Sequence, residues 1–365
     1  MTVKKLKTLF IICFISAYGL FGQSKSIFMI DSLLTELTSK DLFSGAVLIA
    51  DSSKILLSKG YGYSDRENKV KNTPETRFNL SSGSKVFTGT AIVYLAQQGK
   101  LKFTDTIGQY ISGLPKGNVI TIHQILTHSA GFNEFYNLKG YNDDSVKNCT
   151  DVMPYMRATP LVYLPGDSCL YSTGNLVVLG ALVEKISGKN FQDYIKSFLI
   201  DPLDLNNTCF TPYWTLDDSQ RQFAIGYKKV DSIGFKKNAY SYAGNKAVTL
   251  SAGGAWSSIL DLYKFDKAVF SGKIVNQEYL KKMTTKYTHI RTKNPSIWDN
   301  INIGYIWLID DSHTNCIGHA GSSSGWNTWN YFYPEKKVTI IILTNFGSVD
   351  VFDLSGKIEK IMFNE

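Results

Sequence analysis

The chain has 365 residues, of which 44% are hydrophobic and 19% are charged, and its formal net charge at pH 7 is +8. This is an ordinary globular balance in a chain long enough for one large domain or two intertwined lobes with a substantial core. The lysines are scattered rather than striped, and no arginine-rich or RNP-like segment occurs, so the composition argues against a nucleic-acid partner.

The first 22 residues have the layout of a secretory signal peptide. Three lysines precede an apolar run of about 13 residues, Leu9 to Phe21, and Gly22 supplies a small residue at its end. A membrane-spanning helix needs about 20 apolar residues. We therefore predict a signal peptide at residues 1–22 and an exported protein, periplasmic or secreted, with no stable membrane span after cleavage. An uncleaved anchor is the alternative. Removing the three leader lysines lowers the formal charge from +8 to +5.

Four cysteines lie beyond this segment, and their spacing does not predict a metal site. They contain no C-x-x-C pair, whereas zinc ligands cluster at short, repeated spacings. Export would permit one or two disulfides, and buried thiols are the alternative. The four residues are Cys149, Cys169, Cys209 and Cys316.

Taken in chain order, the folded part begins with strands. Ser44 to Asp65 contains two β-prone apolar runs split by a polar turn, which predicts a hairpin. From Val86 to Gln98 apolar residues recur near helical spacing, and Gly99 supplies a stop signal. Residues 100 to about 245 then predict mainly helices, of which the clearest are ITIHQILTH, NLVVLGALVEKISG and FQDYIKSFLIDPL.

The C-terminal part returns to strands after one further helix, SSILDLYKFDKAVFSG. The segments INIGYIWLID and TWNYFYPEKKVTIIILTN are β-prone, the second turns at Pro334–Glu335, and a closing helix is expected from about Phe352 to Phe363. Because both ends of the chain supply strands, we predict an α/β sandwich in which a mainly antiparallel sheet is flanked by helices. This sandwich would be built from about residues 40–100 and 246–365. An inserted, mainly helical lobe would be formed by about residues 101–245.

One S-x-x-K sequence, Ser82 to Lys85, is the first candidate for chemistry. Residues three apart on a helix share a face about 5–6 Å apart, so Lys85 can lie beside the Ser82 hydroxyl and act as its base if it is desolvated. At a helix start, the exposed N–H groups also favour an oxyanion above Ser82. From this spacing alone, a helix-capping serine followed by a solvated lysine is the alternative.

A competing nucleophile is Ser323, within the G-x-S-x-G sequence Gly321 to Gly325. This nucleophile elbow requires a strand before it and a helix after it. The residues that follow, Trp326 to Tyr333, are aromatic and β-prone. We therefore reject Ser323 as the nucleophile.

Two further segments support Ser82. Tyr171 follows Pro165–Gly166 just ahead of an apolar helix, and His319–Ala320–Gly321 lies on a predicted strand. In order, FNLSSGSK, YST and HAG resemble the three motifs of the serine β-lactamase and penicillin-binding-protein superfamily, on its class C side with related esterases and D-peptidases. ITIHQILTHSAGF and SAGGAWSSILDLYKF resemble two further family segments, and the resemblance covers roughly residues 40 to 345.

The resemblance implies a β-lactamase/transpeptidase-like fold over residues 23–365 and a covalent acyl-enzyme that needs no cofactor. Ser82 would be the nucleophile and Lys85 its proton acceptor. Tyr171 would share the acid/base work, with its pKa depressed by neighbouring cationic groups. The backbone N–H groups of Ser82 and Ser322 would form the oxyanion hole. Substrate contacts are expected from Thr173, His319, Gly321, Trp256 and Trp326, together with the segment from Phe132 to Asp151.

Two departures from the family pattern bear on the substrate. Thr173 stands where the family has asparagine, and a single hydroxyl replaces a carbonyl acceptor and two N–H donors. His319 stands where the family has lysine, and an imidazole with an unperturbed pKa near 6.5 is only fractionally charged at neutral pH. Ser81, in place of glycine, and His123, in place of arginine, are two smaller departures to which we attach no function.

The sequence therefore predicts an exported serine hydrolase that acts on an ester, amide or D-peptide, a small-molecule or peptide substrate that the cell wall could supply. The two departures rank an esterase or D-peptidase above a true class C-like β-lactamase or DD-peptidase. A non-catalytic cell-wall-binding protein of the same fold is the alternative from another functional class.

Overall fold

A computed structural model of the chain describes residues 24–136, 138, 140–142, 145–210, 222–230, 234–237, 248–290, 301–311 and 314–364. The predicted signal peptide, residues 1–22, lies outside these ranges.

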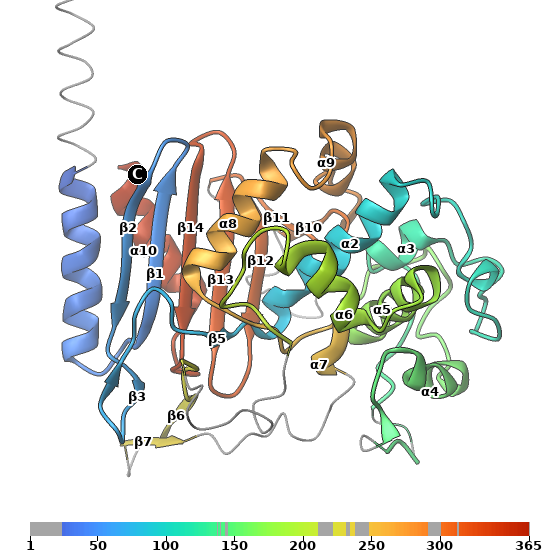
Figure 1. Cartoon of the computed structure of the whole chain (residues 1–365), viewed down its shortest axis with the longest axis horizontal. Coiled ribbons are helices and arrows are strands. Elements are labelled where there is room, and N and C mark those ends of the chain that lie inside the picture. The colour runs from blue at the N-terminus through green and yellow to red at the C-terminus, as the bar shows by residue number, and fades with distance from the viewer. Residues whose placement is uncertain are drawn as a thin grey trace, which may run out of the picture.

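The fold is organised around an eight-stranded antiparallel sheet with the strand order β2-β1-β14-β13-β12-β11-β10-β9 (Figure 1). Its strands are β1 (Gly45–Asp51), β2 (Ile55–Tyr61), β9 (Thr288–His289), β10 (Ile301–Ile303), β11 (Leu308–Asp310), β12 (Cys316–Ser322), β13 (Asn327–Tyr333) and β14 (Val338–Thr344). β1 pairs with β14 from Gly45 opposite Thr344 to Asp51 opposite Val338. Strands from the two ends of the chain thus lie side by side in the middle of one sheet.

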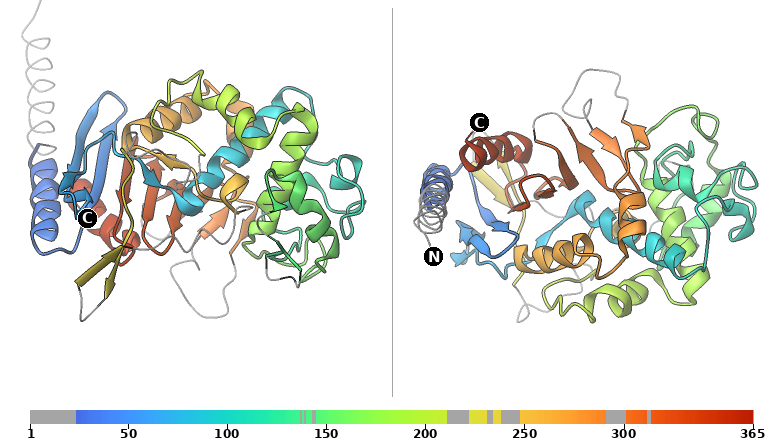
Figure 2. Two further views of the ribbon diagram at one scale, coloured as in Figure 1. Left: turned by 60° about the horizontal axis from the view of Figure 1, so that its bottom comes forward. Right: turned by 90° about the horizontal axis from the view of Figure 1, so that it is seen from above.

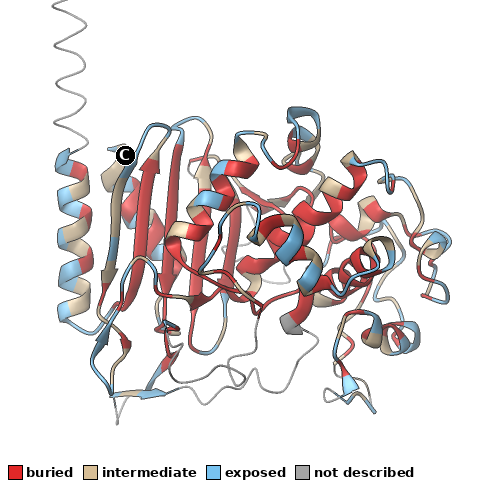
Figure 3. Ribbon diagram, in the orientation of Figure 1, coloured by how far each residue is buried: buried red, intermediate tan, exposed pale blue. Residues whose placement is uncertain are grey.

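Both faces of the sheet are covered, which explains the continuous apolar runs of its central strands. In β1, Ala46 and Leu48 belong to one hydrophobic core, and Val47 and Ile49 to the other. The first core lies under α2 (Lys85–Gln97) and α8 (Ile259–Phe270), and the second under α10 (Val351–Phe363) and the helix of residues 24–39 (Figure 2). Strands β1, β13 and β14 are accordingly buried along most of their length (Figure 3).

The remaining helices gather mainly at the end of the molecule away from β2 (Figure 1). They are α3 (Ile122–Leu126), α4 (Met153–Ala158), α5 (Thr173–Ser187), α6 (Phe191–Ile195), α7 (Val248–Ser251) and α9 (Gln277–Met283). Short strands complete the described part: β3 (Tyr63–Asp65), β4 (Val70–Lys71), β5 (Phe78–Asn79), β6 (Tyr227–Val230), β7 (Gly234–Lys237) and β8 (Trp256–Ser257). Single helical turns cover Ser81–Ser84, Ile107–Gln109, Thr150–Val152 and, as a π-helix, Lys196–Ile200.

The predicted fold class is confirmed, and so are its main elements. The N-terminal hairpin and the closing helix form as expected. Gly99 lies just beyond the end of α2 and Gly188 caps α5, and their φ angles of 68° and 69° suit glycine. The helix expected over FQDYIKSFLIDPL is shorter than predicted, because α6 passes into the π-helical turn. The boundaries of the two expected lobes stay predictions.

Cysteine chemistry and membrane spans can be examined within the described residues. All four cysteines among the described residues are thiols, and none of them is joined in a disulfide. No helix in this part of the chain is long and apolar enough to cross a membrane.

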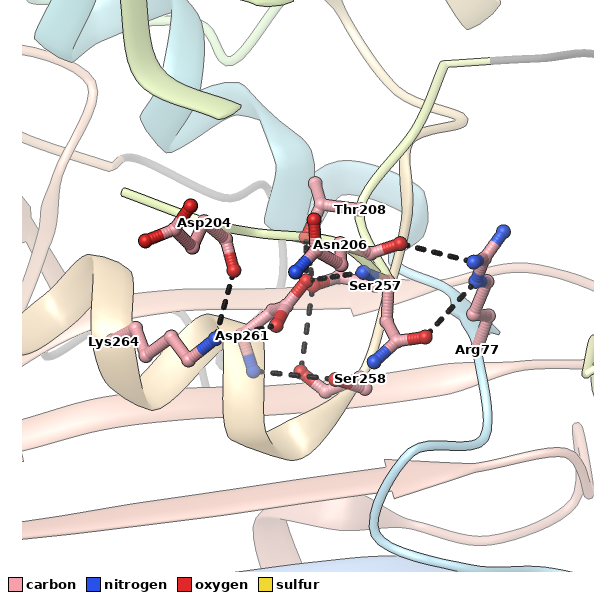
Figure 4. Close-up of polar contacts among 9 residues, drawn as sticks. Arg77, Asp204, Asn206, Thr208, Ser257, Ser258, Asp261 and Lys264 are labelled. Atoms are coloured by element: carbon pink, nitrogen blue, oxygen red, sulfur yellow. Dashed lines mark hydrogen bonds and ion pairs between the residues drawn. The ribbon is translucent and has the colours of Figure 1, made fainter. Parts of the chain in front are cut away.

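A polar cluster fastens the start of α8 to the segment that follows the π-helical turn (Figure 4). The buried Asp261 carboxylate accepts hydrogen bonds from the backbone N–H of Asn207 at 2.7 Å and from the Thr208 hydroxyl at 3.0 Å. Ser258 caps α8 by accepting from the N–H of Asp261 at 3.2 Å, and Arg77 donates to the carbonyl of Asn206 at 3.0 Å. Because the short β5–β8 pair lies between these contacts, the cluster helps to fix the strand that leads into the candidate site.

Candidate active site

The candidate nucleophile Ser82 lies in the 3₁₀ turn Ser81–Ser84 between β5 and α2. The turn is held from both sides: the N–H of Leu80 donates to the carbonyl of Ala255 at 2.8 Å, and the N–H of Gly83 donates to the carbonyl of Leu80 at 2.8 Å. Ser82 itself stays half-buried. The short β5–β8 pair and this turn therefore present the Ser82 hydroxyl at the start of α2.

Lys85 is buried beside this hydroxyl. Its Nζ lies 2.8 Å from Ser82 Oγ and also donates to the carbonyl of Ala252, and the residue is 2% exposed. Burial lowers the pKa of Lys85 to about 7, although the negative charge of Glu134 opposes the shift. The alternative of a solvated lysine in the first turn of the helix is thus wrong.

Tyr171 lies across from this pair, immediately before the N-cap residue of α5. Lys85 Nζ is 5.1 Å from the centroid of the Tyr171 ring. The same ring stacks on His128 with centroids 4.8 Å apart, and its centroid is 6.1 Å from that of His319. The structure therefore brings Ser82, Lys85, Tyr171 and His319 together from three separate parts of the sequence.

His128 is a component of this cluster to which the sequence reading gave no role. Its Nδ1 accepts the backbone N–H of Ser172 at 3.1 Å and faces the side-chain nitrogen of Asn175 at 3.1 Å. The neutral ring therefore carries its proton on Nε2. Burial, followed by the charges of Lys85 and His319, lowers the pKa of His128 to about 3. The segment ITIHQILTHSAGF contains this residue, but nothing in its pattern shows that the ring packs on Tyr171.

His319 is a buried side chain beside Tyr171, so the substrate contact predicted for it is not exposed in this structure. It lies on β12 opposite Asn330, is 1% exposed, and its Nδ1 donates to the carbonyl of Ala320 at 2.5 Å. Burial, and then the charge of Lys85, lowers the pKa of His319 to about 3. The fractional positive charge that the unperturbed pKa suggested is therefore absent at neutral pH.

The end of β12 packs closely on the turn Ser81–Ser84, which we call the nucleophile turn. A Cβ atom at Gly321 would lie 2.1 Å from the carbonyl oxygen of Leu80 and 3.1 Å from the nitrogen of Ser82, so this contact requires glycine. The next residue, Ser322, is exposed. The N–H of Ser323 donates to the carbonyl of Trp326 on the β13 side. Because successive N–H groups along a strand point to opposite edges, the N–H of Ser322 points away from β13.

The other edge of β12 is paired over part of its length. β11 pairs with residues 316–318 of β12. Within the described residues, no strand pairs with residues 319–322 on this edge.

Two predicted substrate contacts are corrected by the structure. Trp256 and Trp326 are each 1% exposed, and they pack edge to face with centroids 5.6 Å apart. Trp326 also donates from Nε1 to the carbonyl of Ala224 at 3.0 Å. Both indoles thus belong to the core and offer no surface to a ligand. Within the segment 132–151, Phe132 and Phe135 are buried as well, whereas Tyr136 and Tyr141 are half-buried.

Thr173 begins α5 at the edge of the site and is half-buried. Its backbone N–H donates to Glu134 Oε1 at 2.8 Å. Burial raises the pKa of the Glu134 carboxyl, whereas the N–H of Thr173 and the charge of Lys85 lower it. Glu134 is a site residue that the sequence reading missed, because one acidic residue in a loop carries no recognisable spacing.

Two other residues singled out in the sequence, Ser323 and His123, lie outside the cluster around Ser82. Ser323 follows β12 and precedes β13, so the expected rejection of a nucleophile elbow is confirmed. His123 lies in an aromatic cluster, with Nδ1 3.0 Å from the Tyr305 hydroxyl.

The chain is similar to known proteins over most of its length. Residues 30–357 match the family model described as Beta-lactamase. The Bacillus subtilis protein PbpX, named as a penicillin-binding protein, is 28% identical over 326 residues, which cover 88% of this chain and 76% of that protein.

Solved structures show the same fold. A penicillin-binding protein from Bacillus halodurans has a TM-score of 0.78 at 24% identity, with 90% of this chain and 98% of that one covered. The D-amino acid amidase from Ochrobactrum anthropi SV3, complexed with L-phenylalanine amide, has a TM-score of 0.77 at 19% identity, with coverage of 92% and 98%.

Proposed function

Because this chain belongs to the beta-lactamase family, we propose that it is a serine hydrolase that forms a covalent acyl-enzyme on Ser82. The observation that carries the proposal is the contact of 2.8 Å between Lys85 Nζ and Ser82 Oγ, made by a lysine whose pKa burial lowers to about 7. A lysine with this pKa is substantially unprotonated near neutrality and can accept the proton of a serine hydroxyl.

In the proposed reaction, Ser82 Oγ attacks the carbonyl carbon of the substrate while its proton passes to Lys85. The carbonyl oxygen becomes an oxyanion, which accepts hydrogen bonds from the backbone N–H groups of Ser82 and Ser322. The bond to the leaving group then breaks, and Tyr171 delivers a proton to the departing oxygen or nitrogen. Water attacks the resulting ester by the reverse route, which releases the acid and restores the Ser82 hydroxyl.

The charges around the site favour an ester or a D-amino acid amide, neither of which carries a carboxylate, over a β-lactam. A β-lactam carries a carboxylate that a fixed cation would bind, but burial keeps His319 neutral. Glu134, whose negative charge acts on Lys85, would repel such a carboxylate when ionised. The likeness to a D-amino acid amidase supports amides of D-amino acids as the first compounds to test.

A substrate panel tests this proposal. It would compare p-nitrophenyl acetate, D-alanyl peptides and D-amino acid amides with a chromogenic cephalosporin, each assayed with wild type and Ser82→Ala. We expect hydrolysis of an ester or D-amide that Ser82→Ala abolishes. Efficient cephalosporin turnover would reverse the ranking of substrates, and equal activity of Ser82→Ala would overturn the proposed nucleophile.

Export is part of the proposal and rests on the signal-like layout of residues 1–22. The test is N-terminal sequencing of the protein recovered from the culture medium or periplasm. A mature chain that starts near residue 23 supports export, and an intact N-terminus on cytoplasmic protein contradicts it.

A further inference from the structure

We propose that the hydrogen bond between Ser81 and Ser323, called here the Ser81–Ser323 bridge, positions the two backbone N–H groups that stabilise the oxyanion. The Ser81 hydroxyl donates to Ser323 Oγ at 2.8 Å. Ser81 directly precedes Ser82, and Ser323 directly follows Ser322. Each serine of the bridge is therefore one residue away from one of the two N–H groups. The inference rests on the proposed function, because an oxyanion forms only if Ser82 is acylated.

The Ser81 end of the bridge is fixed by its backbone. Ser81 has a φ of 50°, in the left-handed region, and is 1% exposed. Its N–H donates to Asn79 Oδ1 at 2.9 Å. Glycine adopts this backbone conformation without strain, but it has no hydroxyl to reach Ser323. The substitution Ser81→Gly therefore removes the bridge and keeps the backbone conformation.

The Ser323 end is fixed by the turn between β12 and β13. Its N–H donates to the carbonyl of Trp326 at 2.9 Å, and its hydroxyl donates to the same carbonyl at 3.3 Å. Ser323 Oγ thus accepts a hydrogen bond from Ser81 and donates its own to the carbonyl of Trp326, so both hydroxyl protons of the bridge have an acceptor. Trp326 is buried in the core. The bridge therefore ties the nucleophile turn to a rigid part of the molecule.

The Ser81–Ser323 bridge restrains movement along the strand, which the close contact at Gly321 does not. Gly321 touches the same turn through its backbone, and that close approach limits how near the two segments come. It does not prevent them from sliding past each other along the strand. A hydrogen bond is directional, and this one is partly shielded from water because its Ser81 end is buried. It therefore fixes the register of the N–H of Ser322 relative to that of Ser82.

The experiment measures acylation of the full chain by a fluorophosphonate, together with hydrolysis of p-nitrophenyl acetate. The variants are Ser81→Gly, Ser323→Ala and the double variant. Removing a whole oxyanion donor slows catalysis by about 100- to 1,000-fold, so misplacing one is expected to lower the maximal acylation rate by about 10-fold. The concentration for half-maximal acylation should change by less than about twofold, because only the transition state is affected. The double variant should be no slower than the slower single variant.

Ser84→Ala is the matched control within the same turn. Its hydroxyl donates to the carbonyl of Ser81 at 2.8 Å and stays inside the turn. In the double variant of Ser84→Ala and Ser323→Ala, the fold reduction in acylation rate should equal the product of the two single reductions. A bridge that matters only for stability would lower the melting temperature of Ser81→Gly and Ser323→Ala and leave their acylation rates at the wild-type value. That result overturns the proposal. So does a double variant of Ser81→Gly and Ser323→Ala whose reduction in acylation rate equals the product of the two single reductions. In both cases Ser82 is still labelled, so the proposed function stands. Failure to label Ser82 in the wild type would instead overturn the proposed function and the bridge's role with it.

Discussion

Lys85 Nζ lies 2.8 Å from Ser82 Oγ, and the lysine is almost completely shielded from solvent. Both facts are needed for the proposed chemistry, because contact alone would leave a protonated lysine that cannot accept a proton. Burial supplies the second requirement by lowering the pKa of Lys85 to about 7. The two histidines in the same cluster are kept neutral by burial, so Lys85 is the one group among these three whose charge changes near neutral pH.

The first prediction concerns the pH dependence of the reaction. If neutral Lys85 is the base, kcat/KM should rise with pH through a pKa of about 7 and level off above it. The measurement is hydrolysis of p-nitrophenyl acetate from pH 5.5 to 8.5. Lys85→Met should lose about 100- to 10,000-fold in rate and the ionisation with it. A wild-type rate that does not change over this range contradicts the role of Lys85.

The second prediction concerns stability rather than rate. Lysine has a pKa near 10.4 in an unfolded chain, whereas burial lowers that of folded Lys85 to about 7. Between these values the unfolded chain binds more protons, so stability should rise as the pH increases from 7 to 10.

Lys85→Met removes the ionisable group and with it this dependence of stability on pH. The melting temperature of Lys85→Met minus that of the wild type should therefore be about 2–4 °C larger at pH 7 than at pH 9.5. Thermal unfolding at the two pH values checks this. The same difference in melting temperature at both would show that folded Lys85 keeps an ordinary pKa.

The third prediction concerns the close approach of β12 to the nucleophile turn. A methyl group at residue 321 would clash with the carbonyl of Leu80. Gly321→Ala should therefore push Ser82 out of place and lower kcat/KM by about 10- to 100-fold, since displacements near 1 Å have effects of this size.

Gly356→Ala is its control. Gly356 lies within α10 and a Cβ there meets no atom within 4 Å. This variant should keep wild-type kinetics and gain up to about 1 kcal/mol in the free energy of unfolding. Wild-type kinetics for Gly321→Ala would show that the turn tolerates displacement.

The fourth prediction concerns His128. Phenylalanine would preserve the stack on Tyr171 but could not accept the buried N–H of Ser172. His128→Phe should therefore lower the free energy of unfolding by about 1–3 kcal/mol. Urea unfolding measures the loss, with His123→Phe as a less buried histidine control that should lose under about 1 kcal/mol. Equal losses for the two variants would argue against a special role for the His128 acceptor.

Much of the fold follows from local signals in the sequence. The two apolar runs of the first hairpin, split by a polar turn, and the long apolar run of α5, closed by Gly188, need no tertiary information. The spacing of Ser82 and Lys85 also suffices to place them together, because three residues span one turn. Helix α6 is harder, since its change into a π-helical turn depends on packing that local periodicity does not encode.

The site's environment could not be predicted in the same way, because burial is a property of the whole fold. The charge of His319 depends on its position between β13 and the core, which the HAG motif does not show. Trp256 and Trp326 flank recognisable motifs, yet they pack on each other, and Trp326 donates to the carbonyl of the distant Ala224. Glu134 enters the site through one backbone contact with Thr173, and such contacts leave no periodic trace.

The central claim is that Ser82 is the nucleophile, and a labelling experiment tests it most directly. The full chain is treated with a fluorophosphonate, and the adduct is counted by intact mass and located by peptide mapping. We predict one adduct per chain, on Ser82, that forms more slowly in Lys85→Met and is absent from Ser82→Ala. An adduct on another serine such as Ser323, or no adduct at all, would contradict the account.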